Sequence, residues 1–501
     1  MKKIFLTIAI AFAVISCEDA TEITQPSEFN AGIAFQSVED VKSGIFQIYG
    51  SANVTTGISF TSHFTDECAL GSSGNQGSTT HRLQLNPTDG FATGLWSSYN
   101  SVIRNANILF IGAQEVTPAD AAEQALYDEA LGENHALRAY AYSQLLAYFS
   151  QDLSDGSSLA TPIFDNVPGS SFAPRRNTVD EVVAKINDDL TQAETLLTSA
   201  GTAYTNDFVS IQFIRALRAR VAAYVGDYAT ATSSANNVLA QFSLPTSANE
   251  ASYREVWQDV AGAGTNNEVI FKFNNTLTNG NNIGSIYNTN NSTAAGSPLY
   301  EVSRNLYQTL EDNSTSNGDI RRNVFIDASS TIVADYDNDP NPLFNDRLVV
   351  DKYPGDPALP GLTGGLTNDQ KVFRTAEMHF ILAEAAAEAN QLSNVATQIK
   401  IVRDARYTTP APLPTYASAT EAWADILLER KIELAFEGHR YIDMKRLGTL
   451  ANQNYDRNET DCSLYPSAEC DLSVTDFRAR ALPIPLNEIQ GNPGITQNSG
   501  Y

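Results

Sequence analysis

Two stretches of the chain hold paired helical segments packed with alanine, and they constrain the fold more than any other feature. In residues 211–242 apolar residues recur at helical spacing, Gly226 and Asp227 interrupt them, and small residues lie on both sides of the interruption. Residues 378–406 repeat the order of alanine-packed helix, polar turn and second helix. Tetratricopeptide-like pairs of this kind bury a face only by stacking on neighbouring pairs. The sequence therefore predicts a mostly α-helical protein with one continuous scaffold.

Other segments extend this scaffold, and one interrupts it. Residues 126–152 and 421–447 have helical periodicity and could supply further pairs, and Thr178 with Glu181 forms the pattern of a capping box. Residues 250–375 differ, because they are rich in Asn, Gly, Thr and Tyr and contain brief β-like runs at 268–273 and 347–353. Binding residues are common on loops that a rigid scaffold carries, so we expect the ligand at this insertion.

The N-terminus has the pattern of a bacterial lipoprotein signal. Two lysines precede an apolar run over residues 4–15, which is too short to span a membrane, and Cys17 stands where cleavage is due. The end of this run resembles a lipobox, which predicts a signal peptide over 1–16, lipidation of Cys17 and a tether over 17–34. Several acyl chains on Cys17 would anchor the protein stably to a membrane. The acidic pair Glu18 and Asp19 resembles a surface-export signal. The alternative is an ordinary cleaved signal with a chance cysteine.

The net charge bears on nucleic-acid binding, and the cysteine spacing bears on disulfide and zinc sites. The formal net charge is −26 and no basic stripe occurs, which argues against a nucleic-acid partner. Cys462 and Cys470, eight residues apart in a loop-like stretch, could pair in an oxidising compartment, and Cys68 would then be left over. No metal-type CxxC spacing occurs, so we expect no zinc.

One acidic run resembles the start of a calcium-binding loop. Asp335, Asp337 and Asp339 occupy alternate positions, and Asp346 stands at the twelfth place. However, Pro340 lies where such loops require glycine, and their last ligand is normally glutamate. Two interpretations stay open, a calcium site and a solvated acidic turn; no other cofactor is expected.

The most highly charged stretch, residues 426–446, supports two interpretations. Its periodicity predicts a helix over 421–437 that ends at Gly438, followed by a second helix. Glu433 and Glu437 could serve as acid and base in glycoside hydrolysis, with His439 nearby. Arg430, one turn from Glu433, would instead lower its pKa, whereas a general acid needs a raised pKa. We therefore predict a structural charge network and no catalytic residue.

Residues 427–448 resemble the signature of SusD/RagB-type outer-membrane lipoproteins. The matching residues are Glu429, Arg430, Glu433, Leu434, Phe436, Glu437, Gly438, Arg440, Asp443 and Arg446. Further pieces agree with the family in the same order, at 136–149, 226–231, 267–271, 319–322, 372–389 and 481–501. The likeness runs from the lipobox to Tyr501. One departure is a longer loop at 152–164.

The resemblance implies one SusD-like domain over residues 35–501, with an N-terminal part at about 35–245 and a C-terminal part at about 250–501. It implies four tetratricopeptide-like helix pairs plus a loop-rich insertion. It also implies a non-enzymatic lipoprotein on the exterior of the cell outer membrane. Such a protein binds oligosaccharide, or peptide in some branches, and delivers it as a hinged lid to a SusC-like TonB-dependent transporter. The alternatives are a lipid-anchored glycoside hydrolase and a purely structural lipoprotein.

Candidate ligand residues follow from the way proteins hold glycans. Sugars lie against exposed aromatic rings while polar side chains bind their hydroxyls. The aromatic candidates are Trp96, Tyr287 and Tyr300, and Asp66 and Arg82 could donate or accept hydrogen bonds near the 71–90 loop. Trp96 could instead belong to the core, because apolar residues continue its helical face. Tyr287 and Tyr300 lie among Gly, Asn and Ser, so we expect them to be exposed.

Overall fold

The computed structural model describes nine stretches of the chain, which are residues 34–71, 78–167, 173–259, 268–276, 283–287, 298–333, 345–355, 366–462 and 469–501. The predicted signal, the lipidated Cys17 and the predicted tether up to residue 33 lie outside these residues, as do Asp335, Asp337 and Asp339. The predictions made for those positions stay predictions.

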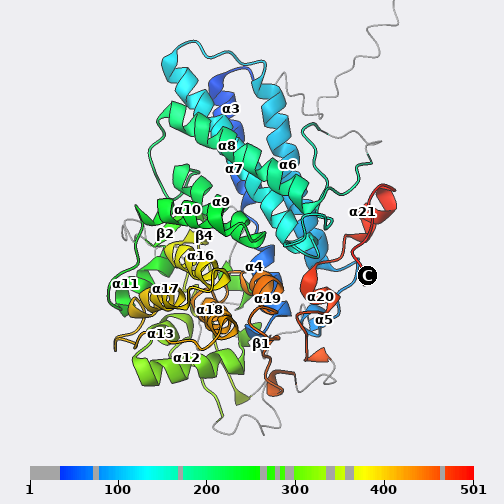
Figure 1. The fold of residues 1–501 in the computed structure, drawn as a ribbon. Helices are drawn as coiled ribbons and strands as arrows, with labels where there is room; N and C mark the ends of the chain where they lie inside the picture. Colours follow the sequence, from blue (N-terminus) through cyan, green and yellow to red (C-terminus); the bar gives the residue numbers. More distant parts are fainter. Residues whose placement is uncertain are drawn as a thin grey trace, which may run out of the picture.

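Most of the described chain is α-helical, as predicted (Figure 1). The N-terminal helices are α3 (Val38–Ala52), α4 (Thr56–Phe64), α5 (Ser78–His81), α6 (Gly90–Ala113), α7 (Ala121–Phe149) and α8 (Val179–Ala200). The middle of the chain forms α9 (Ile211–Tyr224), α10 (Tyr228–Leu239), α11 (Glu250–Gln258), α12 (Arg304–Asn317) and α13 (Arg321–Phe325). The C-terminal helices are α16 (Thr375–Glu388), α17 (Leu392–Asp404), α18 (Ala419–Glu433), α19 (Arg440–Leu447), α20 (Phe477–Arg480) and α21 (Leu486–Gly491).

The two alanine-rich stretches form the helix pairs that their sequence predicts. α9 and α10 are joined at Gly226, which has a left-handed φ of 78° that favours glycine. Ala231 and Ala235 of α10 are fully buried, and α10 packs against both α9 and α16 (Figure 1). α16 and α17 form the second pair. The capping box at the start of α8 is also confirmed, because Thr178 and Glu181 bond each other's backbone N–H groups. The total of four tetratricopeptide-like pairs stays a prediction.

Short antiparallel ladders join the inserted region to the scaffold. β1 (Cys68–Leu70) pairs with β3 (Tyr300–Val302), and β2 (Val269–Phe273) pairs with β4 (Gln370–Arg374). The β-like run at 268–273 is therefore confirmed as a strand. The run at 347–353 forms isolated bridges instead, including one from Val349 to Glu301.

The apolar residues form two clusters. The larger cluster is formed by residues of α3, α6, α7, α8, α9, α10 and α16–α19 and also includes buried residues of the β2–β4 ladder. The smaller cluster lies around α11–α13 and the β1–β3 ladder, with Trp257 fully buried. The larger cluster contains residues from both predicted parts of the domain, whose boundaries stay predictions. Among the described residues, no helix is long and apolar enough to cross a bilayer.

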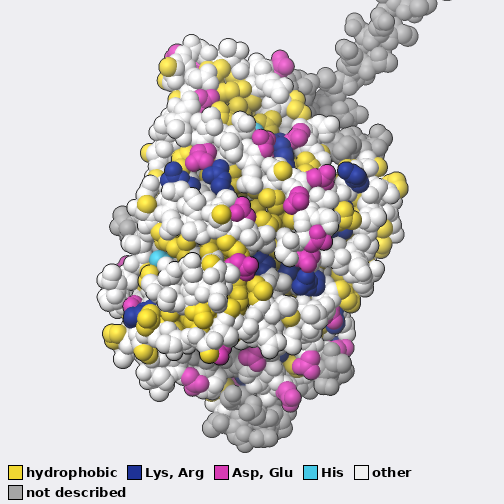
Figure 2. Space-filling model, in the orientation of Figure 1, with side chains coloured by type: hydrophobic (Ala, Val, Ile, Leu, Met, Phe, Trp, Pro, Cys, Tyr) yellow, Lys and Arg dark blue, Asp and Glu magenta, His cyan; other side chains and the backbone are white. Residues whose placement is uncertain are grey.

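The surface is chemically mixed on the face that Figure 2 shows. Acidic and basic side chains are interspersed there with hydrophobic ones, and neither charge forms an extended patch. This face therefore offers no basic stripe to a nucleic acid.

Candidate functional site

The charged motif forms the end of α18, a tight turn and the start of α19. α18 ends at Glu433, so the predicted helix end at Glu437 is wrong. The Lys352 ammonium group donates hydrogen bonds to the carbonyls of Glu433 (3.3 Å) and Ala435 (2.8 Å), which a continuing helix would have used. The chain then turns through Phe436 (φ 66°) and Gly438 (φ 87°).

Glu433 lies at the centre of a buried cluster of guanidinium groups. Its carboxylate accepts hydrogen bonds from Arg406 (2.9 and 3.0 Å), Arg374 (2.9 Å), Arg321 (3.3 Å) and the Tyr253 hydroxyl (3.2 Å). Burial alone would raise the pKa of Glu433, but the charges of Arg406 and Arg374 outweigh it and hold the pKa well below its ordinary value. Glu433 is therefore an ionised structural centre.

The neighbouring motif carboxylates are paired in the same way. Glu437 accepts hydrogen bonds from Lys352 (2.7 Å) and Arg374 (2.7 and 2.8 Å). Burial acts to raise the pKa of Glu437, and the charges of Arg374 and Lys352 lower it overall. Glu429 pairs with Arg321 and Arg403, both at 2.7 Å. A general acid needs a raised pKa and access to substrate, so this geometry does not support hydrolysis by Glu433 and Glu437.

Arg430 has different partners from those that its spacing suggests. It contacts Asp443 (2.7 and 2.8 Å) and Glu384 (3.2 Å). The predicted lowering of the Glu433 pKa is confirmed, but the predicted cause is wrong, because arginines distant in the sequence supply the charge.

Asp66 belongs to the same network. Its side chain is fully buried and accepts hydrogen bonds from Arg440 (2.8 Å, twice) and Lys431 (2.9 Å). Burial opposes ionisation of Asp66, yet the charges of Arg440 and Lys431 lower its pKa well below the usual range. The carboxylate therefore compensates motif cations, and its role in ligand binding stays a prediction.

The three predicted aromatic residues are buried. Trp96 is 3% exposed and meets Phe149 edge-on at 4.9 Å, so its alternative assignment to the core is confirmed. Tyr287 and Tyr300 are 1% and 2% exposed, so the predicted exposure is wrong. The β1–β3 ladder draws Tyr300 inward, where it stacks on His63 with ring centroids 3.6 Å apart. A contact between these rings and a ligand stays a prediction.

Arg82 keeps a partly exposed position. Its guanidinium donates to Glu469 at 2.6 and 3.1 Å, and Gln84 donates to the same carboxylate at 2.9 Å. Among the five predicted ligand residues, Arg82 is the most accessible to solvent. The ion pair between Arg82 and Glu469 also joins the segment after α5 to the segment that holds Cys470.

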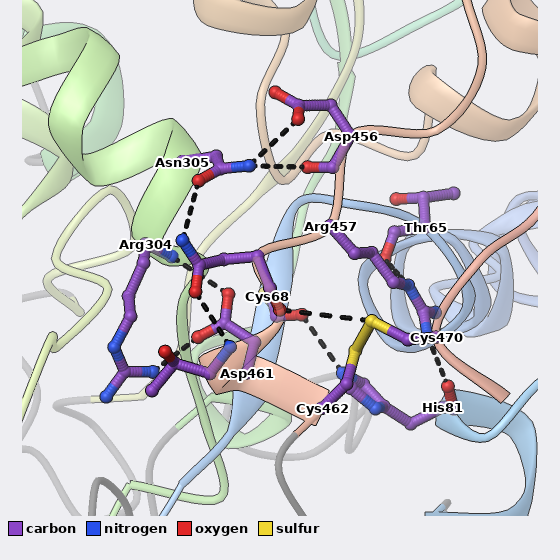
Figure 3. The surroundings of a disulfide bond; sticks show 12 residues. Thr65, Cys68, His81, Arg304, Asn305, Asp456, Arg457, Asp461, Cys462 and Cys470 are labelled. Carbon is purple, nitrogen blue, oxygen red and sulfur yellow. Dashed lines mark hydrogen bonds and ion pairs between the residues drawn. A yellow bond between two sulfur atoms is a disulfide. The ribbon is translucent and has the colours of Figure 1, made fainter. Parts of the chain in front are cut away.

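Cys462 and Cys470 form a disulfide, as predicted, and Cys68 is a buried free thiol (Figure 3). Arg457 lies beside them and donates to the carbonyls of Phe64 (2.6 Å), Thr65 (3.2 Å) and His81 (2.5 Å).

Arg457 could not be identified as a structural residue from the sequence. Its partners are backbone carbonyls almost four hundred residues away, so no motif or spacing marks it. Arg304, which pairs with Asp461 beside the disulfide, was missed for the same reason.

The described residues hold no cluster of three or more His, Cys, Asp or Glu side chains that could bind a metal. Asp346, the twelfth residue of the calcium-like run, is buried and ion-paired with Arg304. Calcium binding stays a prediction, because Asp335, Asp337 and Asp339 lie outside the described residues.

Two cavities lie among the described residues near the motif. The smaller one, of about 50 Å³, has Glu437, Gly438 and His439 in its wall and offers room for water. The larger one, of about 380 Å³, lies between the loop after α7, the α9–α10 turn and the segment from α19 to residue 450. Its volume falls within the range of small-molecule sites.

Two family models match this chain. The model described as the SusD family matches residues 253–501, and the one described as "Starch-binding associating with outer membrane" matches residues 19–211. A curated relative, "SusD-like protein P25" of Formosa agariphila, is 29% identical over 140 residues. That match covers 27% of this chain and 25% of the relative, so it spans about a quarter of the relative's length.

Solved structures resemble the whole fold. A SusD superfamily protein from Bacteroides thetaiotaomicron has a TM-score of 0.73 at 20% identity and covers 92% of this chain and 99% of its own. A putative sugar binding protein from Bacteroides vulgatus has a TM-score of 0.73 at 21% identity, covering 93% and 99%. At these identities the likeness shows a shared fold.

Proposed function

This chain belongs to the SusD/RagB family, and from that membership we propose that it is an outer-membrane lipoprotein that binds oligosaccharide nutrients. The observation that carries the proposal is the pair of family matches, which fall on both halves of the chain. One of those families is described as starch-binding and associated with the outer membrane. A structural neighbour described as a putative sugar binding protein adds support.

We further propose that lipidated Cys17 anchors the protein on the cell exterior, where it acts as a hinged lid on a SusC-like TonB-dependent transporter. The lipobox-like N-terminus supports the anchor. A lid must move as a rigid body, and the buried network around Glu433 would give it that rigidity, because it joins α18 to residues from α13, β4 and the segment just after α17.

The proposed role is binding without catalysis. The best carboxylate pair for hydrolysis, Glu433 and Glu437, is buried and ion-paired. Arg82 is proposed as a ligand contact because it is partly exposed and carries donors that suit sugar hydroxyls.

The ligand class can be tested on the mature lipidated chain in detergent micelles. A glycan array followed by calorimetry should show saturable binding to at least one polysaccharide. Binding to peptides with flat traces for every glycan would replace the proposal with the peptide-binding alternative. An absence of both would favour a purely structural lipoprotein.

The anchor and its orientation need a separate experiment. The wild-type chain should appear in the outer-membrane fraction and be cleaved by protease added to intact cells. A Cys17→Ala variant should leave that fraction, because it cannot be lipidated. Retention of the variant in the membrane, or protection of the wild type from protease, would contradict the proposed location.

A further inference from the structure

The larger cavity is built by segments that lie far apart in the sequence. Its wall includes Leu153 from the loop after α7, Tyr224 and Tyr228 from the two sides of the α9–α10 turn, Leu447 from α19 and Arg480 from α20. The departure from the family pattern at 152–164 thus begins at the cavity wall. None of the five ligand residues predicted from the sequence lines this cavity.

The wall combines aromatic rings with hydroxyl groups. Tyr224 is 9% exposed, and the Arg446 guanidinium carbon lies 5.1 Å from its ring centroid, which fixes the ring. Tyr228 is half-buried. Among the described residues, neither tyrosine hydroxyl has a hydrogen-bond partner, and both residues line the cavity. Gln151 and Thr449 add further donors and acceptors at the wall.

Two arginines at the cavity are paired with carboxylates, and Glu388 adds a negative charge to the wall that has no ion pair among the described residues. Arg480 contacts Asp152 at 3.2 Å, and Arg446 contacts Glu384 at 2.9 Å. Lys445 donates to the carbonyls of Ala147 (2.8 Å) and Ser150. An anionic ligand would have to displace these internal partners, whereas a neutral ligand would not. The lining therefore favours a neutral molecule that carries both apolar faces and hydroxyl groups.

We infer that this cavity is a binding site for a short, neutral oligosaccharide, with the sugar ring on the half-buried Tyr228 and its hydroxyls on the polar wall, which includes Tyr224. The volume fits about one to three sugar rings. This inference rests on the proposed glycan-binding function and assigns it a ligand class and a place in the fold.

The test uses the mature chain and a panel of neutral trisaccharides, namely maltotriose, laminaritriose, cellotriose, xylotriose and mannotriose. Thr449 is exposed at the cavity wall, and Thr449→Trp would fill the cavity without disturbing a buried contact. Thr195→Trp is the matched control, because Thr195 is also exposed, lies on α8 and does not line the cavity. Calorimetry should show a loss of affinity of about tenfold or more for Thr449→Trp and no change for the control.

Tyr228→Phe provides a second variant in case the tryptophan perturbs folding. It keeps the ring and removes one hydroxyl, so affinity should fall about fivefold, which corresponds to one hydrogen bond. Equal affinity in wild type, Thr449→Trp and Tyr228→Phe would overturn the inference and leave the proposed function intact. Binding of long glycans without any trisaccharide would overturn it in the same way. If no saccharide binds the wild type, both the inference and the proposed function fail.

Discussion

Replacing Glu433 with glutamine tests the interpretation of the charged motif most sharply. The substitution keeps the size of the side chain and removes its charge. In the wild type the carboxylate accepts bonds from Arg406, Arg374 and Arg321, and it is fully buried. A glutamine amide would present N–H groups to these donors and would remove the one carboxylate that all three guanidinium groups share, so that Arg406 keeps only Glu268, Arg374 keeps Glu437, and Arg321 keeps Asp319 and Glu429.

The expected cost is large because the site cannot be solvated. Removing one partner from a buried ion pair typically lowers the free energy of unfolding by about 3–5 kcal/mol. Urea unfolding followed by circular dichroism measures this loss as a lower midpoint. Glu255→Gln is the matched control, because Glu255 is exposed on α11, and its effect should stay within about 0.5 kcal/mol.

Acid should reduce the difference between Glu433→Gln and wild type. The folded-state pKa of Glu433 is depressed, so its stabilisation is present above the ordinary value of 4.5 and is lost as the pH falls further. In an Arg406→Gln background the substitution should cost less, since one of the positive charges is already gone. A loss at neutral pH no larger than that of Glu255→Gln would refute the structural interpretation.

Three further predictions concern other parts of the chain. Replacing Cys462 and Cys470 with alanine should lower the unfolding free energy by about 2–3 kcal/mol, as expected for so short a loop, and unfolding with and without reductant measures this. Burial raises the pKa of Glu67 to about 8 in the folded protein. The free energy of unfolding of the wild type should therefore fall as the pH rises from 4.5 toward 8, and Glu67→Gln removes this dependence. Unfolding compared at about pH 5 and about pH 9 should show Glu67→Gln gaining stability relative to wild type. Trp96→Ala should cost about 3–5 kcal/mol of unfolding free energy, whereas a small effect on stability with a lost glycan affinity would return Trp96 to the ligand site.

The helices could be predicted because their information is local. Apolar spacing and alanine content marked residues 211–242 and 378–406, and Thr178 with Glu181 marked a helix start. The disulfide could be predicted because its cysteines are close in the sequence. The end of α18 could not, since the carbonyls that leave the helix are taken by Lys352, which is distant in the sequence.

The candidate site was predicted less well, because burial is decided by long-range pairing. Polar neighbours of Tyr300 suggested exposure, but β3 pairs with β1 and the ring is buried against His63. Asp66 was predicted to bind ligand near the 71–90 loop, yet Arg440 and Lys431 bind its carboxylate from the motif. The larger cavity carries no sequence signal, because Leu153, Tyr228 and Arg480 meet only in the folded chain.

Binding without catalysis is the central claim, and one titration tests it directly. The mature chain is titrated with the polysaccharide that it selects on the array, and the same samples are then analysed for shortened sugars by chromatography. We predict a saturable heat of binding and an unchanged sugar profile after prolonged incubation. Shortened products that disappear in the Glu433→Gln or Glu437→Gln variant, or a flat titration for every glycan, would contradict the account.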